Sequence, residues 1–156
     1  MNTHHTHVNW HRAQPLPTAL AKYLRANFLQ ITATGIYNDR NVAGTHTKSA
    51  HAEGRALDIH LSVKHPDQKL IADDLYRIFI EAASQTGIDN VIWNRKIWSQ
   101  AKGQHTYHGQ NPHTDHIHLE FTRSGSQLKV WHVLELKVAQ LRGGLENLSH
   151  AQSNIG

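Results

Sequence analysis

The chain contains no cysteine among its 156 residues. Disulfide bonds and thiolate metal ligands are therefore excluded, so any bound metal must be held by histidine and carboxylate side chains. No apolar run approaches the roughly 18 residues of a membrane-spanning helix, and the N-terminus lacks the apolar core of a secretory signal. We therefore predict no membrane span, and expect cytoplasmic residence, export by a route that needs no such signal, or a trimmed chain.

Excess charge of one sign is also small. Lys and Arg number 16 against 12 Asp and Glu, which gives a formal net charge of +4. This mild basic excess favours an anionic partner, such as nucleic acid or an acidic cell-wall polymer, without choosing between them. Histidine is abundant instead, with 15 residues. We set His4, His5 and His7 aside, because they lie in a polar segment at the start of the chain.

Hydrophobic spacing predicts a single domain of the α+β class. The pattern indicates helices at about 17–29 and 66–86, the second ended by Gly87, and strands at 31–37, 56–63, 88–94, 96–99 and 115–122. We expect a hairpin around Asn94-Arg95, and loops at 38–49 and 100–112. After Gly125, steps of three and four predict a long amphipathic helix over about 128–148, with a break at Gly143-Gly144. We therefore divide the chain into a core of residues 1–125 and a helical extension of residues 126–156, which either packs on the core or projects as an interaction helix; we favour packing.

Two stretches of the sequence carry the chemistry, Ser49–Asp58 and His113–His118. Gly54 allows a tight turn, so that a loop His51 and a strand Asp58 can face the same point. Period-2 alternation in the strand at 115–122 places His116, His118 and Glu120 on one face and apolar residues on the other. Catalytic zinc takes three protein ligands and keeps a fourth position for water. We interpret His51, Asp58 and His118 as those ligands.

His116 lies two residues before His118 on the same strand face. It is placed to reach a metal-activated water without binding the metal, and histidine as a residue type suits the role of general base. His113 stands at His-x-x-His-x-His spacing with the pair, so we include it in the site. We interpret His60 and His105 as ordinary surface or hydrogen-bonded residues.

These residues resemble a known family. The pattern Ser49-x-His51-x-x-Gly54-x-Ala56-x-Asp58, followed by His116-x-His118, is similar to the LAS-type zinc metallopeptidases, which include D-alanyl-D-alanine carboxypeptidases and murein endopeptidases. The resemblance implies a small antiparallel sheet that carries one zinc ion (Zn2+) and is flanked by helices, as in the related hedgehog domain. It implies His51, Asp58 and His118 as ligands, His116 as base and His113 as a residue that orients water or substrate.

The resemblance also implies an upstream arginine that stabilises the oxyanion, for which Arg40 is the candidate, and contacts from Ser49 and Arg40 to the substrate. Many carboxypeptidases of the group end in Glu-x-x-His with Glu as base. This chain has His116 instead, which favours an endopeptidase-like site.

The sequence therefore predicts a zinc peptidase that hydrolyses an amide in the stem peptide or cross-link of peptidoglycan, of the endopeptidase or D,D-carboxypeptidase type. Such an enzyme would act in the periplasm or cell wall, as a phage lytic enzyme or an antibacterial effector with an immunity protein or secretion partner; no nucleic acid partner is predicted. Two alternatives remain at this point, a non-catalytic zinc-containing binding module of the hedgehog type and a metal-dependent nuclease.

Overall fold

The computed structural model describes residues 7–153 and shows an α+β fold built on one open, six-stranded antiparallel sheet. The strand order is β1-β2-β6-β3-β4-β5. The strands are β1 (Thr34–Gly35), β2 (Ala56–Ile59), β3 (Ile88–Trp93), β4 (Lys96–Ser99), β5 (Gly103–Thr106) and β6 (Ile117–Phe121). The helices are α1 (Pro15–Asn27), the 3-10 turn η1 (His51–Glu53), α2 (Pro66–Glu81), α3 (Ala83–Thr86), α4 (Arg123–Ser126) and α5 (His132–Ser153).

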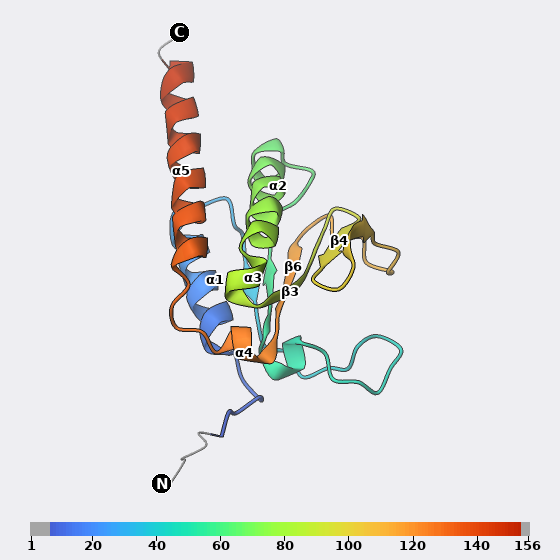
Figure 1. Cartoon of the computed structure of the whole chain (residues 1–156). Helices are drawn as coiled ribbons and strands as arrows, with labels where there is room; N and C mark the ends of the chain where they lie inside the picture. The colour runs from blue at the N-terminus through green and yellow to red at the C-terminus, as the bar shows by residue number, and fades with distance from the viewer. Residues whose placement is uncertain (1–6, 154–156) are drawn as a thin grey trace, which may run out of the picture.

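The helices α1, α2 and α5 gather on one side of the sheet, and long loops extend on the other (Figure 1). Alternation in the strands explains this division, because Leu57, Ile59 and Leu119 are fully buried in the core. Asp58 and His118 stand between these residues and project from the opposite face. They are directly paired across β2 and β6. The sheet therefore presents an apolar face to the helices and a polar face to the loops.

The predicted helices are confirmed with small changes at their ends. α1 buries Leu16, Leu20 and Leu24, one residue per turn, against the sheet. The helix expected at 66–86 is present as α2 and α3, and Gly87 ends it at φ 69°. Leu70, in the first turns of α2, is half exposed.

The hairpin around Asn94-Arg95 is confirmed. Both residues have positive φ, 47° and 66°, as a two-residue turn between β3 and β4 requires. Two other expectations were wrong. The strand expected at 31–37 shortens to Thr34–Gly35, and the loop expected at 100–112 contains β5. β5 was not predicted because three of its four residues are exposed, so its sequence shows no alternation of apolar and polar residues.

The chain after β6 begins with the short α4 and continues into α5, which runs through Gly143 and Gly144 without the expected break. Leu134 and Val138 of α5 are fully buried and belong to the same apolar cluster as the residues beneath α1 and α2. The Trp131 ring packs edge-on against Tyr23, with centroids 5.4 Å apart. Within residues 7–153, no helix combines the length and apolar character needed to cross a membrane.

Candidate metal centre

His51 is held by a tight turn. Ser49 begins this turn, since its hydroxyl oxygen accepts a hydrogen bond from the Ala52 amide. Gly54 ends it at φ 68°, and a Cβ there would lie 1.7 Å from the Arg12 carbonyl oxygen, so only glycine fits. His51 Nδ1 lies 2.7 Å from the Ile36 carbonyl oxygen. Nδ1 therefore carries a hydrogen, and Nε2 is the nitrogen that faces Asp58 and is available to a metal ion.

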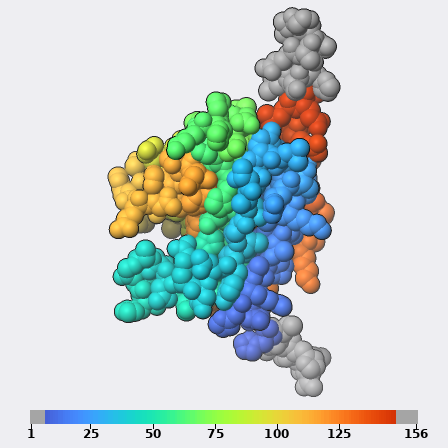
Figure 2. All heavy atoms as spheres, turned by 180° about the vertical axis from the view of Figure 1, so that it is seen from behind, coloured from blue at the N-terminus to red at the C-terminus, as the bar shows by residue number. Residues whose placement is uncertain are grey.

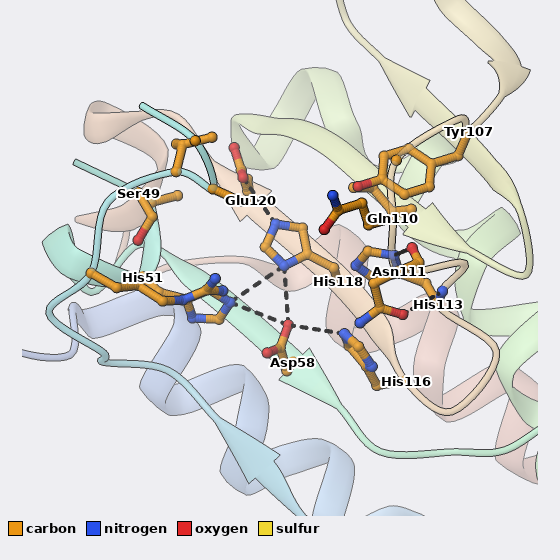
Figure 3. Close-up of a pocket in the computed structure, with 17 residues that line it drawn as sticks. Ser49, His51, Asp58, Tyr107, Gln110, Asn111, His113, His116, His118 and Glu120 are labelled. Atoms are coloured by element: carbon orange, nitrogen blue, oxygen red, sulfur yellow. Dashed lines mark hydrogen bonds and ion pairs between the residues drawn. The ribbon is translucent and has the colours of Figure 1, made fainter. Parts of the chain in front are cut away.

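Three donor atoms from distant parts of the chain meet on the polar face of the sheet (Figure 3). His51 Nε2 lies 3.2 Å from Asp58 Oδ1, and Asp58 Oδ1 lies 3.0 Å from His118 Nδ1. The third side of the triangle, from His51 Nε2 to His118 Nδ1, is 3.3 Å. Tetrahedral ligands 2.0–2.1 Å from zinc lie about 3.3 Å from one another. The predicted ligand set is thus a possible metal-binding triad, and it is the one such cluster among the described residues.

Behind His118 lies a second carboxylate. Glu120 Oε1 is 2.9 Å from His118 Nε2, and Glu120 Oε2 accepts a hydrogen bond of 2.8 Å from Asn90 Nδ2. With Nε2–H donated to Glu120, the Nδ1 atom of His118 is free to face Asp58 and His51. Both histidines of the triad thus have one nitrogen anchored and the other turned to the common point.

The surroundings of the triad stabilise a positive charge at its centre. Burial of Asp58 would raise its pKa, but hydrogen bonds to His118 and His51 outweigh burial and hold the pKa far below the ordinary value. Burial likewise opposes charge on His118, yet hydrogen bonds to Asp58 and Glu120 raise the pKa of His118 to about 9. Two carboxylates around two imidazoles form a pocket that stabilises a cation, and a bound metal ion would take the place of that proton.

His116 stands beside the triad and outside it. Its Nδ1 lies 2.8 Å from Asp115 Oδ1, and its Nε2 lies 3.9 Å from Asp58 Oδ1. Asp115 therefore accepts the Nδ1 hydrogen and leaves the Nε2 lone pair on the side of the triad. The strand pattern predicted that His116 lies within a strand at 115–122. In the structure it immediately precedes β6, which begins at Ile117. Its ring also stacks on His60, with centroids 5.5 Å apart.

His113 forms the next wall of the site. Its ring centroid lies 4.6 Å from that of His116. Its backbone has a positive φ of 54°, and its Nδ1 bonds the Asn111 carbonyl oxygen at 2.7 Å. Burial lowers the pKa of His113 to about 4, although the bond to Asn111 opposes this. His113 is consequently neutral near pH 7, with Nε2 as an acceptor.

Comparison with protein families gives one match. Residues 10–118 match the model described as VldE, C-terminal domain. The chain belongs to this VldE C-terminal domain family. The matched segment begins at Trp10 and ends at His118, so it contains the whole triad together with His113 and His116. No curated protein and no solved structure matches the chain.

Within the VldE family segment, the triad forms the floor of a cleft of about 650 Å³. One wall is the loop that carries Arg40, Val42 and Gly44, and the other carries Tyr107 and Gln110. Figure 2 shows these two loops as separate lobes on the left of the view from behind, with a notch between them. The cleft places the triad within reach of an elongated ligand.

The remaining predicted residues lie at different depths. Ser49 lines the cleft but uses its hydroxyl oxygen to hold the η1 turn. Arg40 lines the cleft rim with an exposed side chain, and its hydrogen bonds in the structure are made by its backbone. His105 lies exposed on β5, away from the triad. Glu120, Asn90 and Asp115 were not predicted as site residues, although the period-2 alternation places Glu120 on the same strand face as His118.

Proposed function

We propose that this chain is a zinc-dependent peptidase that hydrolyses an amide of peptidoglycan, either in the stem peptide or in a cross-link. The observation that carries the proposal is the triangle of His51, Asp58 and His118, with the unliganded His116 beside it. Its edges of 3.0–3.3 Å suit one zinc ion, and the donors are two imidazoles and a carboxylate. Two neutral nitrogens and one anionic oxygen match the donor set of catalytic zinc sites.

Zinc bound by these three residues would supply a Lewis acid and bring the pKa of a water molecule toward about 7. The chain's own contribution begins with His116. Its Nε2 lone pair faces the triad and can take the water proton, while Asp115 holds Nδ1–H and fixes the ring. His116 can then deliver that proton to the departing amine of the substrate.

His113 has a different part. Because it is neutral and its Nδ1 hydrogen is donated to Asn111, it offers only an acceptor to the cleft. It can orient a water molecule or a substrate N–H, but it cannot stabilise a developing negative charge. Arg40 at the cleft rim is the residue that we assign to that task and, together with Ser49, to substrate contact.

The proposed substrate class rests on the similarity of the motifs to those of the LAS-type zinc peptidases. That similarity also implies a hedgehog-like arrangement of the sheet. It is supported by the open cleft between two loops, which suits an elongated peptide. The net charge of +4 suits an anionic cell-wall polymer. On this proposal the enzyme acts in the periplasm or cell wall, as a lytic enzyme or an antibacterial effector.

The test is digestion of purified peptidoglycan by zinc-loaded protein, with fragments identified by mass spectrometry. We expect new free amines from stem peptides and intact glycan strands. New reducing sugar ends without new amines would indicate a glycosidase and contradict the proposal. Zinc binding at the triad without any hydrolysis would instead favour the binding-module alternative.

A further inference from the structure

Glu120 is a carboxylate that touches a triad residue without belonging to the triad. Its side chain is one quarter exposed at the cleft floor, where a carboxylate could act as a base. Both of its oxygens are engaged, however, one with His118 Nε2 at 2.9 Å and the other with Asn90 Nδ2 at 2.8 Å. Each oxygen of Glu120 therefore already accepts a hydrogen bond, one from His118 on its own strand β6 and one from Asn90 on β3.

The Asn90 side chain is oriented with its amide nitrogen toward Glu120. It is paired with Glu120 across β3 and β6. Its Oδ1 is buried without a hydrogen-bond partner, while its Nδ2 faces the carboxylate. Turning the amide over would bring Oδ1 against a negatively charged oxygen, so the unpaired Oδ1 is retained as the less costly choice. Asn90 thus holds Glu120 in one orientation.

We propose that Glu120, held by Asn90, is a positioning residue that sets His118 as a metal ligand through Nδ1. When a metal ion replaces the second hydrogen of the ring, a His118 that keeps its Nε2 hydrogen on Glu120 binds through Nδ1, and Nδ1 is the atom that meets Asp58 and His51. Without Glu120, the neutral His118 ring could carry its hydrogen on either nitrogen. The inference rests on the metal site of the proposed function, and it does not depend on the reaction.

The experiment measures zinc affinity by competition with a chromophoric chelator, using the full chain. Glu120→Ala should weaken zinc binding roughly 10–100-fold, the usual effect of losing a hydrogen-bond partner of a ligand. Asn90→Ala should give a smaller loss in the same direction. Asp89→Ala is the matched control, since Asp89 neighbours Asn90 on β3 and makes no ion pair among the described residues; its affinity should equal that of the parent.

The variant Glu120→Gln distinguishes the orienting effect of the hydrogen bond to His118 from the effect of the negative charge of Glu120. A glutamine oxygen can still accept the His118 Nε2 hydrogen, and Asn90 can turn to offer its unpaired Oδ1 to the new amide. Glu120→Gln should therefore retain most of the parent affinity. Nitrogen chemical shifts of the zinc-loaded parent should show His118 protonated at Nε2 and coordinated through Nδ1.

Parent-like affinity in Glu120→Ala would overturn the inference, and so would Glu120→Gln binding as weakly as Glu120→Ala. Circular dichroism of each variant shows that the fold is retained. The hydrolysis assay is separate, so a protein that binds zinc with the expected order of affinities but cleaves no peptidoglycan contradicts the proposed function and leaves this inference standing.

Discussion

Each histidine of the triad has one ring nitrogen committed to an oxygen of the protein. The Ile36 carbonyl holds His51 and the Glu120 carboxylate holds His118, so the other nitrogens are aimed before any ion arrives. Preorganisation of this kind reduces the entropy that must be lost on binding. Single substitutions at the triad should consequently remove metal affinity and leave most of the fold, because the sheet beneath is held by separate apolar contacts.

The first prediction concerns the ligand set. His51→Ala, Asp58→Ala and His118→Ala should each lower zinc occupancy sharply, because each removes one of three protein donors. Elemental analysis after dialysis against a weak chelator measures this. His105→Ala, a histidine on exposed β5, should keep about one zinc per chain. Full occupancy in the three triad variants would refute the assignment.

The second prediction concerns His116. His116→Ala should retain zinc, because Nε2 lies 3.9 Å from Asp58 Oδ1 and His116 is not part of the triad. Its turnover of peptidoglycan should fall about 10²–10⁴-fold, the usual share of a general base. His113→Ala should also retain zinc, with a smaller loss of turnover. Zinc content and hydrolysis should be measured on one preparation; loss of metal in His116→Ala would show that ligand and base have been exchanged.

The metal-binding residues could be predicted from the sequence, but the hydrogen-bond partners that orient them could not, for a physical reason. Period-2 alternation put Asp58 on the polar face of one strand and His118 on that of another, and both placements are confirmed. The partners of the ring nitrogens were not predictable, because they depend on strand register and on a backbone carbonyl. The positive φ of His113 is a further example, since nothing in its neighbours requires it.

At the scale of elements, α2 and β3 are joined by one polar contact in an apolar interface. The indole nitrogen of fully buried Trp93 donates to Asp73 Oδ1 at 2.9 Å, and Lys69 bonds the other oxygen at 2.7 Å. Burial would raise the pKa of Asp73, but the hydrogen bonds from Lys69 and Trp93 outweigh it, so the pKa lies below the ordinary 3.8. The charged form of Asp73 is therefore the one that stabilises the fold.

The third prediction follows from that contact. Asp73→Ala should lower the free energy of unfolding by about 1–3 kcal/mol at pH 7, because it leaves the buried Trp93 N–H without an acceptor. Since the folded pKa is lowered, the charge-dependent part of the stability is present above pH 3.8 and lost as the pH falls below it. Urea unfolding at pH 7 and pH 3 should show the difference between parent and variant shrinking at the lower pH. A difference independent of pH would mean that the carboxylate charge contributes nothing.

Elements also differ in how well sequence predicts them. α1 and α2 were placed within a few residues because each buries one apolar stripe, which a 3.6-residue period records. β5 was missed because it is an exposed strand of Gly, Gln, His and Thr, held by its hydrogen bonds to β4. The Gly143-Gly144 pair was interpreted as a break, yet α5 continues through it, and a Cβ added at either position would meet no atom within 4 Å.

For the molecule as a whole, the question is what α5 contributes. Tyr23 hydroxyl donates to the Glu135 carbonyl oxygen at 3.3 Å, and Lys137 pairs with Glu81 at 2.9 Å, so α5 contacts both α1 and α2. Leu134 and Val138 lie fully buried between these contacts. The first half of α5 therefore covers apolar surface that the rest of the core would otherwise expose to water.

The fourth prediction tests this contribution. Leu134→Ala should lower the free energy of unfolding by about 2–5 kcal/mol, as expected for a buried leucine. Leu136→Ala is the matched control: Leu136 lies two positions along the same helix and is 60% exposed. Its unfolding free energy should stay within about 0.5 kcal/mol of the parent. Equal effects of the two substitutions would mean that α5 does not pack as the structure has it.

Deletion of residues 126–156 tests the contribution of the whole C-terminal segment to the stability of the fold. Uncovering the surface beneath Leu134 and Val138 should cost roughly 3–6 kcal/mol, and small domains have only about 5–15 kcal/mol in total. The shortened protein should therefore unfold or aggregate and lose zinc, although no triad residue has been removed. A shortened protein that stays folded and binds zinc like the parent would contradict the prediction and favour the alternative of an interaction helix, because the core would then need no cover there.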